Sequence, residues 1–212
     1  MVLKLYNKPD EIEVGIDEVG RGCLFGPVYS AAVILPKTFD DDIYKGIKDS
    51  KQLSSKKREY FAEYIKGIAI DYSVGIVDNN IVDDLNILGA TMKSMHLALD
   101  DLSISVDRIL VDGDKFKQYL DNNGNFISHT CIPKGDNTFL SIACASIIAK
   151  TERDKYICEL VKKIPTLEKY GLITNKGYGT KQHINAIKIN GITKWHRVSF
   201  SPCSQYSNSI NK

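Results

Sequence analysis

The feature that most constrains the fold is the stretch VGIDEVGRGCLFGPVYSAAVIL at residues 14–35. It holds two apolar runs, which favour neighbouring strands of a buried sheet. Between them stand two adjacent carboxylates, Asp17 and Glu18, and a Gly-Arg-Gly triplet at 20–22. A bare charge in a buried strand is costly unless a partner or ligand compensates it, and adjacent strand residues point to opposite faces. We therefore expect one carboxylate to lie where the strand ends or is distorted, so that both can reach the same cation.

The rest of the chain alternates between predicted strands and helices. Apolar and alternating runs predict three more strands, at residues 70–77, 108–114 and 125–133. Apolar residues at helical spacing predict helices capped at Ser54 or Ser55 and ending near Gly67, then over 78–102 and 138–164, and from a Thr180 cap to Gly191. This order predicts an α/β fold with a sheet of about five strands and a helical C-terminal segment.

Composition excludes several classes of protein. With 212 residues, 43% hydrophobic and 25% charged, the chain fits one compact domain rather than a disordered or collagen-like chain. The N-terminal residues contain no apolar signal-peptide core, and the apolar run at 139–149 is too short to span a bilayer, so we expect a cytoplasmic protein without a membrane anchor. The five cysteines are widely spread and form no zinc-ligand pattern, so we expect them to be reduced.

The charge is distributed unevenly along the chain. Residues 151–212 carry 11 Lys and Arg against 4 Asp and Glu, whereas residues 1–150 carry 17 against 22. A basic segment with interleaved aromatic residues suits a nucleic-acid backbone. On charge alone, a solvated basic face explains the segment equally well.

Two further carboxylates stand where predicted elements meet. Asp112 ends a strand before a glycine, and Asp136 lies in a Gly-Asp-Asn turn before a helix, so each taken alone fits a turn or an N-cap. If the strands are neighbours, however, these two join Asp17 and Glu18 at one edge of the sheet. Four clustered carboxylates repel one another unless a divalent ion is bound, and oxygen ligands without sulfur or imidazole select Mg²⁺ or Mn²⁺. Two such ions roughly 4 Å apart would form a phosphoryl-transfer site.

The glycine run at 20–26 allows other readings. A dinucleotide-dependent oxidoreductase is one, but the spacing is GxGxxxG, and Pro27 and a second β run follow where a dinucleotide site needs a helix. Glycine does let backbone approach a ligand closely, for example a sugar hydroxyl. A non-catalytic nucleic-acid binder, with the carboxylates acting as turn and cap residues, is the third hypothesis.

Six segments in this order resemble type 2 ribonuclease H (ribonuclease HII). They are GIDEVGRGCLFGPVYSAAVIL, KDSKQLSSKKRE, ILVDGD, KGDNTFLSIACASIIAKTERD, NKGYGTKQH and WHRVSFSPC, and the likeness runs from about residue 14 to 203. The Gly-Arg-Gly triplet resembles the one in type 2 enzymes, and type 3 enzymes lack it. The resemblance implies a ribonuclease H-like mixed five-stranded sheet flanked by helices. It divides the chain into a catalytic core at 1–160, a helical basic C-terminal segment of the same domain at 161–204, and a disordered tail at 205–212.

The resemblance also implies site residues. The catalytic metal ligands would be Asp17, Glu18, Asp112 and Asp136, holding Mg²⁺ or Mn²⁺, two ions in the substrate complex. The backbone of Gly20, Arg21 and Gly22 would recognise a ribose 2′-hydroxyl, Tyr178 would stack on a sugar, and Lys51 would approach a phosphate. The implied activity is hydrolysis of the RNA strand of RNA–DNA hybrids, and of the phosphodiester 5′ of single ribonucleotides in duplex DNA, leaving 3′-hydroxyl and 5′-phosphate ends. We expect a monomer whose partner is such a duplex.

Several positions depart from the family pattern or have no assigned role. Cys23 stands where many members have Pro, Asp114 where Asn is common, and Cys144 where Ala is common. Asp114 adds a carboxylate close to the expected metal site, although a solvated turn fits it as well. For His183 and His196, proton transfer, phosphate contact and purely structural hydrogen bonding all remain open.

Overall fold

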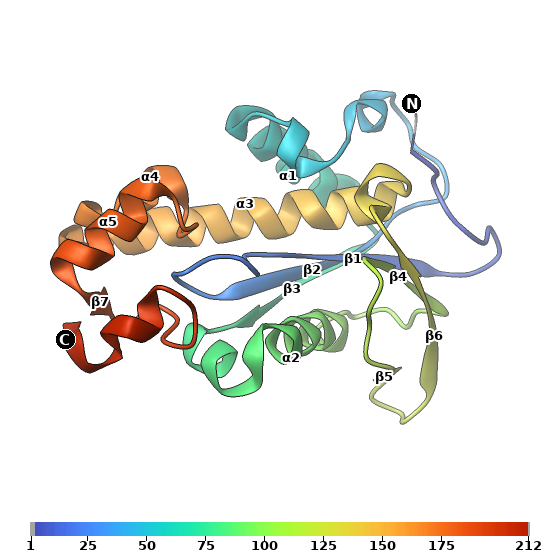
Figure 1. The fold of residues 1–212 in the computed structure, drawn as a ribbon. Helices are drawn as coiled ribbons and strands as arrows, with labels where there is room; N and C mark the ends of the chain where they lie inside the picture. Colours follow the sequence, from blue (N-terminus) through green and yellow to red (C-terminus); the bar gives the residue numbers. More distant parts are fainter. Residues whose placement is uncertain (1–2, 212) are drawn as a thin grey trace. The chain divides into compact units, whose positions relative to one another are not determined.

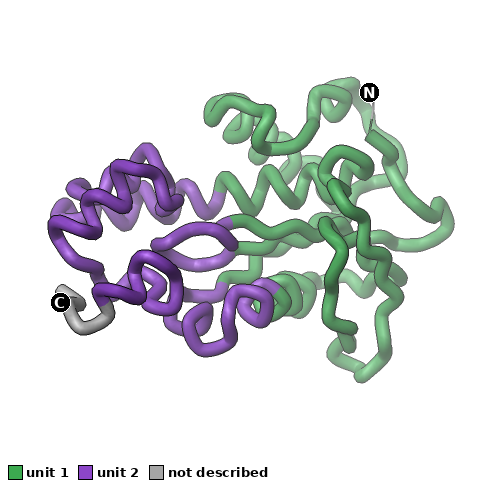
Figure 2. The backbone as a smooth tube through the Cα atoms, viewed as in Figure 1, with its two compact units in different colours: residues 1–19, 29–76, 92–151 green, residues 20–28, 77–91, 152–212 purple. Residues whose placement is uncertain are grey.

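The computed structural model describes residues 3–211, and the chain divides into two compact units (Figure 2). Unit 1 comprises residues 1–19, 29–76 and 92–151, and unit 2 comprises residues 20–28, 77–91 and 152–212. This division follows contacts in space. The expected boundaries at residues 160 and 204 stay a prediction.

The main sheet has six strands in the order β3-β2-β1-β4-β6-β5 (Figure 1). The strands are β1 (Glu13–Val19), β2 (Val28–Ile34), β3 (Asp71–Val77), β4 (Arg108–Asp112), β5 (Tyr119–Leu120) and β6 (Phe126–Ile132). β1 pairs antiparallel with β2 and parallel with β4, β4 pairs parallel with β6, and β5 pairs antiparallel with β6. The sheet is therefore mixed, as expected. The count of five strands was wrong, because a two-residue strand such as β5 is too short to show a period-2 pattern.

In unit 1, helices cover both faces of the sheet (Figure 1). Alternate strand residues point to opposite faces, so Ala31 and Val33 pack with α1 (Ser55–Ile68) and the first half of α3 (Leu140–Lys163), while Ala32 and Ile34 pack with α2 (Asn79–Asp100). The small residues of α3 allow the expected close approach. A Cβ on Gly15 of β1 would lie 2.3 Å from the Ser141 carbonyl carbon, so only glycine fits there.

The helices begin near the predicted caps. The Ser54 side chain accepts a hydrogen bond from the Lys57 backbone N–H at the start of α1, and Thr180 accepts one from the His183 N–H at the start of α5 (Lys181–Asn190). The apolar stripe of α2 hides an interruption at Asn86, which has a positive φ of 59°. Its side chain accepts hydrogen bonds from the N–H groups of Leu88 and Gly89, and so caps a new helical segment.

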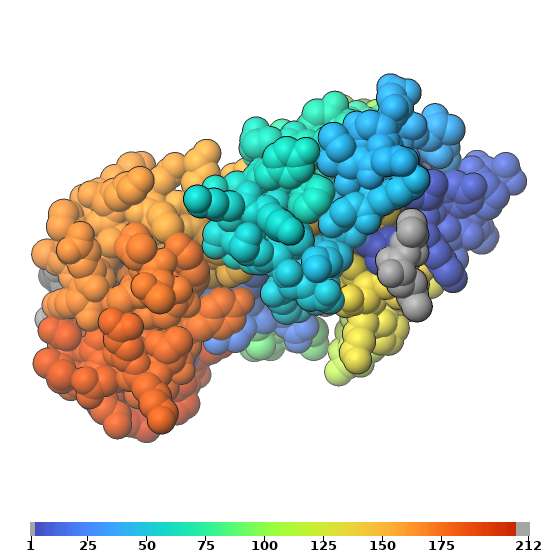
Figure 3. Space-filling view, turned by 90° about the horizontal axis from the view of Figure 1, so that it is seen from above, coloured from blue at the N-terminus to red at the C-terminus, as the bar shows by residue number. Residues whose placement is uncertain are grey.

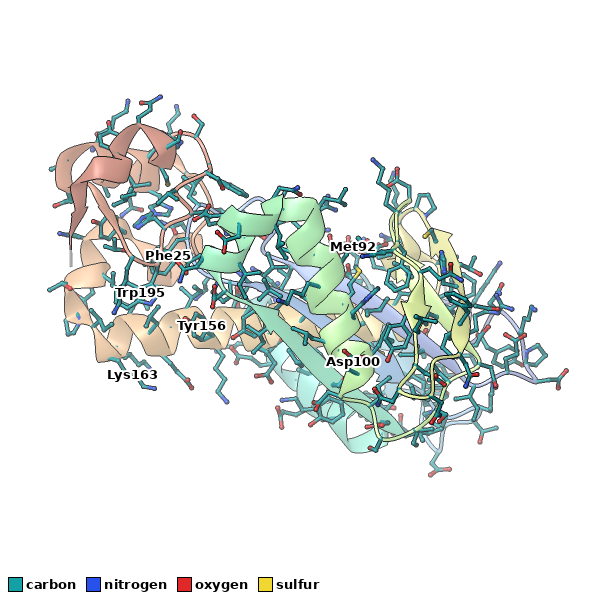
Figure 4. The ribbon with its side chains drawn as sticks, turned by 90° about the horizontal axis from the view of Figure 1, so that it is seen from below. Phe25, Met92, Asp100, Tyr156, Lys163 and Trp195 are labelled. Atoms are coloured by element: carbon teal, nitrogen blue, oxygen red, sulfur yellow. The ribbon has the colours of Figure 1, made fainter. Side chains whose placement is uncertain are left out.

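Unit 2 has its own apolar core, to which the second half of α3 contributes Ile157 and Val161, and it adds several short elements. These are 3₁₀ helices η4 (Pro165–Tyr170) and η5 (Cys203–Ser209), helices α4 (Leu172–Asn175) and α5, and the paired strands β7 (Ile192–Thr193) and β8 (Ile210–Asn211). Phe25 and Trp195 lie together in this core, with ring centroids 6.4 Å apart (Figure 4). Backbone structure thus extends into residues 205–211, which we expected to be disordered, and residue 212 lies outside the described residues.

The structure bears on the expectations about the cysteines and about membrane-spanning segments. All five cysteines fall within the described residues and are free thiols. Among residues 3–211, none of the helices is both long enough and apolar enough to cross a membrane.

Candidate functional site

Three neighbouring parallel strands, β1, β4 and β6, bring the four predicted carboxylates to the same end of the sheet. β1 and β4 pair up to Ile16 and Val111, so Asp17 and Asp112 are the next residues in register. Asp112 is also the last residue of β4 that pairs with β6. The chain leaving β6 turns into a short 3₁₀ helix, η3 (Gly135–Asn137), which carries Asp136. Parallel strands end on the same side of a sheet, so this placement follows from topology.

Asp17 is a buried carboxylate, with 5% of its surface exposed. Its Oδ1 accepts a hydrogen bond of 2.7 Å from the Glu18 backbone N–H, and its side chain also bonds Ser146 of α3. Burial raises its pKa well above the usual range, and the nearby Glu18 and Asp112 carboxylates raise it further. Both Asp17 and Glu18 lie inside β1, but beyond the last residue that pairs with β4.

Asp112 and Asp136 are fixed by the backbone around η3. Oδ1 of Asp112 accepts a 2.7 Å hydrogen bond from the Gly135 N–H, and a Cβ on Gly135 would lie 3.3 Å from that oxygen. Oδ1 of Asp136 accepts a 2.9 Å hydrogen bond from the Asn137 amide. Burial raises the pKa of Asp136, as do the Asp112 and Asp49 charges, whereas Lys51 opposes the shift.

Lys51 is the cation associated with these carboxylates. It lies in η2 (Ser50–Gln52), within a segment at residues 43–68 that is exposed on the surface of unit 1 (Figure 3). Burial lowers its pKa, but Asp49, Asp136, Asp17 and Asp112 outweigh that effect, so the net pKa is raised. The neighbouring Ser50 is tied to Asp17 through Ser146, because the two serine hydroxyls lie 2.9 Å apart.

The donor chemistry of this edge fits a hard divalent cation. The four groups are all carboxylates, and the repulsion that raises the pKa of Asp17 and Asp136 is what a bound cation would relieve. In the described part of the chain, however, no three His, Cys, Asp or Glu side chains already form a group that could hold a metal ion.

Unit 2 contains the other predicted site residues, on two loops that pair with each other. Cys23, next to the Gly-Arg-Gly triplet, forms an antiparallel bridge with Tyr178, and the Leu24 N–H donates a 2.8 Å hydrogen bond to the Gly177 carbonyl. Tyr178 keeps 38% of its surface exposed. Burial of its hydroxyl raises the pKa to about 12, with a contribution from Cys23. The ring is therefore neutral at physiological pH.

Two fully buried arginines hold the loop at 20–28 from within unit 2. Arg197 donates to the carbonyls of Gly26 (3.0 and 2.9 Å) and Arg21 (2.9 Å). Arg153 donates to the carbonyls of Phe25, Pro27 and Lys176 at 2.8–3.0 Å. Their hydrogen-bond acceptors are all backbone carbonyls, and burial lowers the pKa of Arg197 to about 10. Both guanidiniums thereby orient the loop's carbonyl groups inward.

Sequence reasoning missed these two arginines. Arg153 occupies one position of a buried stripe on α3 that otherwise holds Ala149, Ile157 and Val161. A charged residue on an apolar stripe at i, i+4 spacing was the available signal. Arg197 follows the bulky pair Trp195 and His196 in a segment without periodicity, where no signal was present.

Comparison with known proteins decides the family. The sequence profile described as "Ribonuclease HII" matches residues 14–203, which is most of the chain. The chain belongs to the ribonuclease HII family. A curated ribonuclease HII from Phocaeicola vulgatus is 45% identical over 201 residues, covering 95% of this chain and 94% of the relative.

Solved structures agree with the family's fold. The ribonuclease H2 structure from Pyrococcus horikoshii OT3 superposes with a TM-score of 0.73 at 23% identity, covering 92% of this chain and 97% of that one. The ribonuclease HII in the structure of a PCNA:RNase HII complex from Archaeoglobus fulgidus gives a TM-score of 0.69 at 25% identity, covering 90% and 95%. The expected ribonuclease H-like fold is thus confirmed.

Family membership settles the class of activity. As a ribonuclease HII, the chain is a metal-dependent endoribonuclease of the ribonuclease H type, acting on RNA in RNA–DNA hybrids and in ribonucleotide excision. The oxidoreductase hypothesis is wrong. The residues after Gly26 enter β2 rather than a helix, so the glycine run offers no helix N-terminus to a pyrophosphate.

Proposed function

We propose that this ribonuclease HII cuts the phosphodiester on the 5′ side of a single ribonucleotide in duplex DNA, as well as the RNA strand of hybrids. The products would carry 3′-hydroxyl and 5′-phosphate ends. The observation that carries the proposal is the convergence of carboxylates where the pairing of β1 with β4 stops and on η3, in a chain of this family.

The metal ligands in this proposal are Asp17, Glu18, Asp112 and Asp136. Two Mg²⁺ or Mn²⁺ ions bound there would supply Lewis-acid stabilisation of the attacking and leaving oxygens of an in-line displacement. The chain's own residues contribute the fixed geometry. Gly135 holds Asp112 through its backbone N–H, and Ser146 and Glu18 hold Asp17. Lys51, surrounded by these carboxylates, would carry its positive charge to a substrate phosphate.

Selection of the ribose is assigned to the loops of unit 2. The 2′-hydroxyl distinguishes RNA from DNA, and backbone groups of Gly20, Arg21 and Gly22 would bond it. Arg197 holds the carbonyls of Arg21 and Gly26 toward the interior of unit 2. This supports the role, because it fixes the orientation of the loop's backbone groups. The half-exposed ring of Tyr178, on the paired loop, would stack on the adjoining sugar.

The duplex itself would be held without regard to sequence. Residues 151–212 carry 11 basic against 4 acidic side chains, and contacts from Lys and Arg to phosphates provide affinity but no base readout. We propose that the enzyme works as a monomer on such a duplex.

The test is a DNA duplex that contains one ribonucleotide, incubated with Mg²⁺ or Mn²⁺. The parent enzyme is expected to make a single cut on the 5′ side of the ribonucleotide, and Asp112→Asn to lose it. A cut elsewhere, or equal cutting by the variant, would contradict the proposal.

A further inference from the structure

Two histidines without an assigned role form a buried pair in unit 2. His183, on α5, is 0% exposed, and His196, after β7, is 1% exposed. Their Nε2 atoms lie 3.2 Å apart. On its other side, Nδ1 of His183 lies 3.0 Å from the Tyr178 carbonyl oxygen, and Nδ1 of His196 lies 3.0 Å from the Thr193 backbone nitrogen.

The outer partners fix where the hydrogens of this pair must be. The Thr193 N–H can only donate, so Nδ1 of His196 accepts and is bare; the Thr193 hydroxyl, 2.9 Å away, can donate to it too. The Tyr178 carbonyl can only accept, so Nδ1 of His183 carries a hydrogen. With one hydrogen on each neutral ring, Nε2 of His196 donates to the bare Nε2 of His183.

The surroundings of the pair favour these neutral forms. His196 meets the rings of Tyr170 and Phe25 edge-on, with centroids 4.9 and 5.0 Å away. Burial lowers the pKa of both histidines, that of His196 to about 3. A second hydrogen on His183 would set its Nε2–H against the Nε2–H of His196, and a second hydrogen on His196 would set its Nδ1–H against the Thr193 N–H.

We propose that His183 and His196 are positioning residues: a one-directional chain of hydrogen bonds from Thr193 through both imidazoles ends on the Tyr178 carbonyl and fixes the ring of Tyr178. The inference rests on the proposed stacking of Tyr178 on a sugar. The same carbonyl also accepts a 2.8 Å hydrogen bond from the Thr180 N–H, so both of its lone pairs are used while the ring stays half exposed.

Two substitutions at His183 separate the contacts it makes. In His183→Asn, the amide nitrogen can replace Nδ1 and keep the bond to Tyr178. In His183→Gln, the amide reaches the position of Nε2 and keeps only the bond to His196. For a duplex with one ribonucleotide, we expect His183→Gln to raise KM roughly five- to tenfold with little change in kcat, the scale of one lost hydrogen bond. His183→Asn should restore KM to within about twofold of the parent. Equal KM for both variants would overturn the proposal.

A measurement that needs no activity tests the chain itself. In the full-length protein with ¹⁵N-labelled histidine at pH 7, NMR should find both rings neutral and in opposite tautomers, with hydrogen on Nδ1 of His183 and on Nε2 of His196. A charged ring, or the same tautomer in both, would overturn the chain. If the tautomers are as stated but Tyr178→Ala keeps the parental KM, the stacking role in the proposed function fails, and with it the positioning role.

Discussion

For Asp17, the proposed function would come at the expense of stability. Its carboxylate is buried, its pKa is raised by burial and by its neighbours Glu18 and Asp112, and its compensating contacts in the chain are hydrogen bonds from Glu18 and Ser146. A buried charge beside like charges destabilises a fold. The cation that we propose to bind there would explain why a carboxylate stands at this position.

Replacing this carboxylate should therefore separate activity from stability. Asp17→Asn keeps the shape of the side chain but removes a ligand, so we expect cleavage to fall on the order of 10²-fold or more. In EDTA at pH 7, the melting temperature of the variant should equal or exceed that of the parent, since repulsion is relieved. Thermal unfolding followed by circular dichroism checks this. A melting temperature several degrees lower would contradict the account.

His196 gives a prediction about pH. Its pKa is about 3 in the folded protein, because of burial and then of His183, against 6.5 in the unfolded chain. The unfolded state thus binds more protons, so stability is complete above pH 6.5 and falls as pH drops toward 3, by about 1.4 kcal/mol per pH unit from this group. Urea unfolding between pH 7 and 4 should show a shallower fall for His196→Gln. Identical slopes for variant and parent would refute the assignment.

At the scale of elements, the loop at 20–28 owes its conformation to two arginines that belong to other segments. Arg153 comes from α3 and Arg197 from the chain after β7, and together they bind five carbonyls. A lysine ammonium offers a single compact charge, so it cannot reproduce the planar fork of donors that a buried guanidinium directs at several carbonyls.

Arg197→Lys should accordingly reduce the free energy of unfolding by about 3 kcal/mol, the scale at which a buried charge loses its partners. Arg108→Lys is the matched control. Arg108 binds Glu11 where the pair is partly exposed to solvent, and the exchange there should cost under about 1 kcal/mol. Urea titration of both variants provides the comparison, and equal costs would count against the anchoring role of Arg197.

Local patterns explain which elements could be predicted. The caps at Ser54 and Thr180 and the end of α5 at Gly191 follow from short-range chemistry, and the structure confirms them. The sequence pattern did not reveal the break at Asn86, because the apolar stripe continues past it. Nor did it reveal β5, because a strand of two residues is too short to show an alternating pattern. The apolar stripe of α3 carried a signal for Arg153, but its carbonyl partners and the role of Arg197 depend on tertiary contacts that no residue pattern encodes.

For the whole molecule, topology explains why the acidic edge could be anticipated. Asp112 ends β4, Asp17 lies just beyond the residues of β1 that pair with β4, and Asp136 lies in the turn after β6, so the parallel neighbours place the three together. The roles of these residues came from resemblance to a family rather than from pattern. The positions of the side chains that would hold an ion, and the contacts of His183, could not be predicted from the sequence pattern because they depend on tertiary structure.

The excess of basic residues at 151–212 also makes a prediction at this scale. Binding of the Asp112→Asn protein, which we expect to be inactive, to duplex DNA should weaken at least about tenfold between 50 and 200 mM salt, because phosphate contacts release counterions. A duplex with one ribonucleotide should show the same salt slope as an all-DNA duplex, since the 2′-hydroxyl adds no phosphate. Fluorescence anisotropy measures both, and affinity that does not change with salt would contradict the role of the basic segment.

We propose that the carboxylates Asp17, Glu18, Asp112 and Asp136 direct hydrolysis to the 5′ side of a ribonucleotide. The most direct measurement is mass spectrometry of the products from a duplex with one ribonucleotide, with Mg²⁺ or Mn²⁺, for the parent and Asp112→Asn. For the parent alone, we expect a DNA fragment ending in a 3′-hydroxyl and a second fragment beginning with the 5′-phosphorylated ribonucleotide. A 2′,3′-cyclic phosphate, a cut on the 3′ side, or the same products from Asp112→Asn would contradict the proposal.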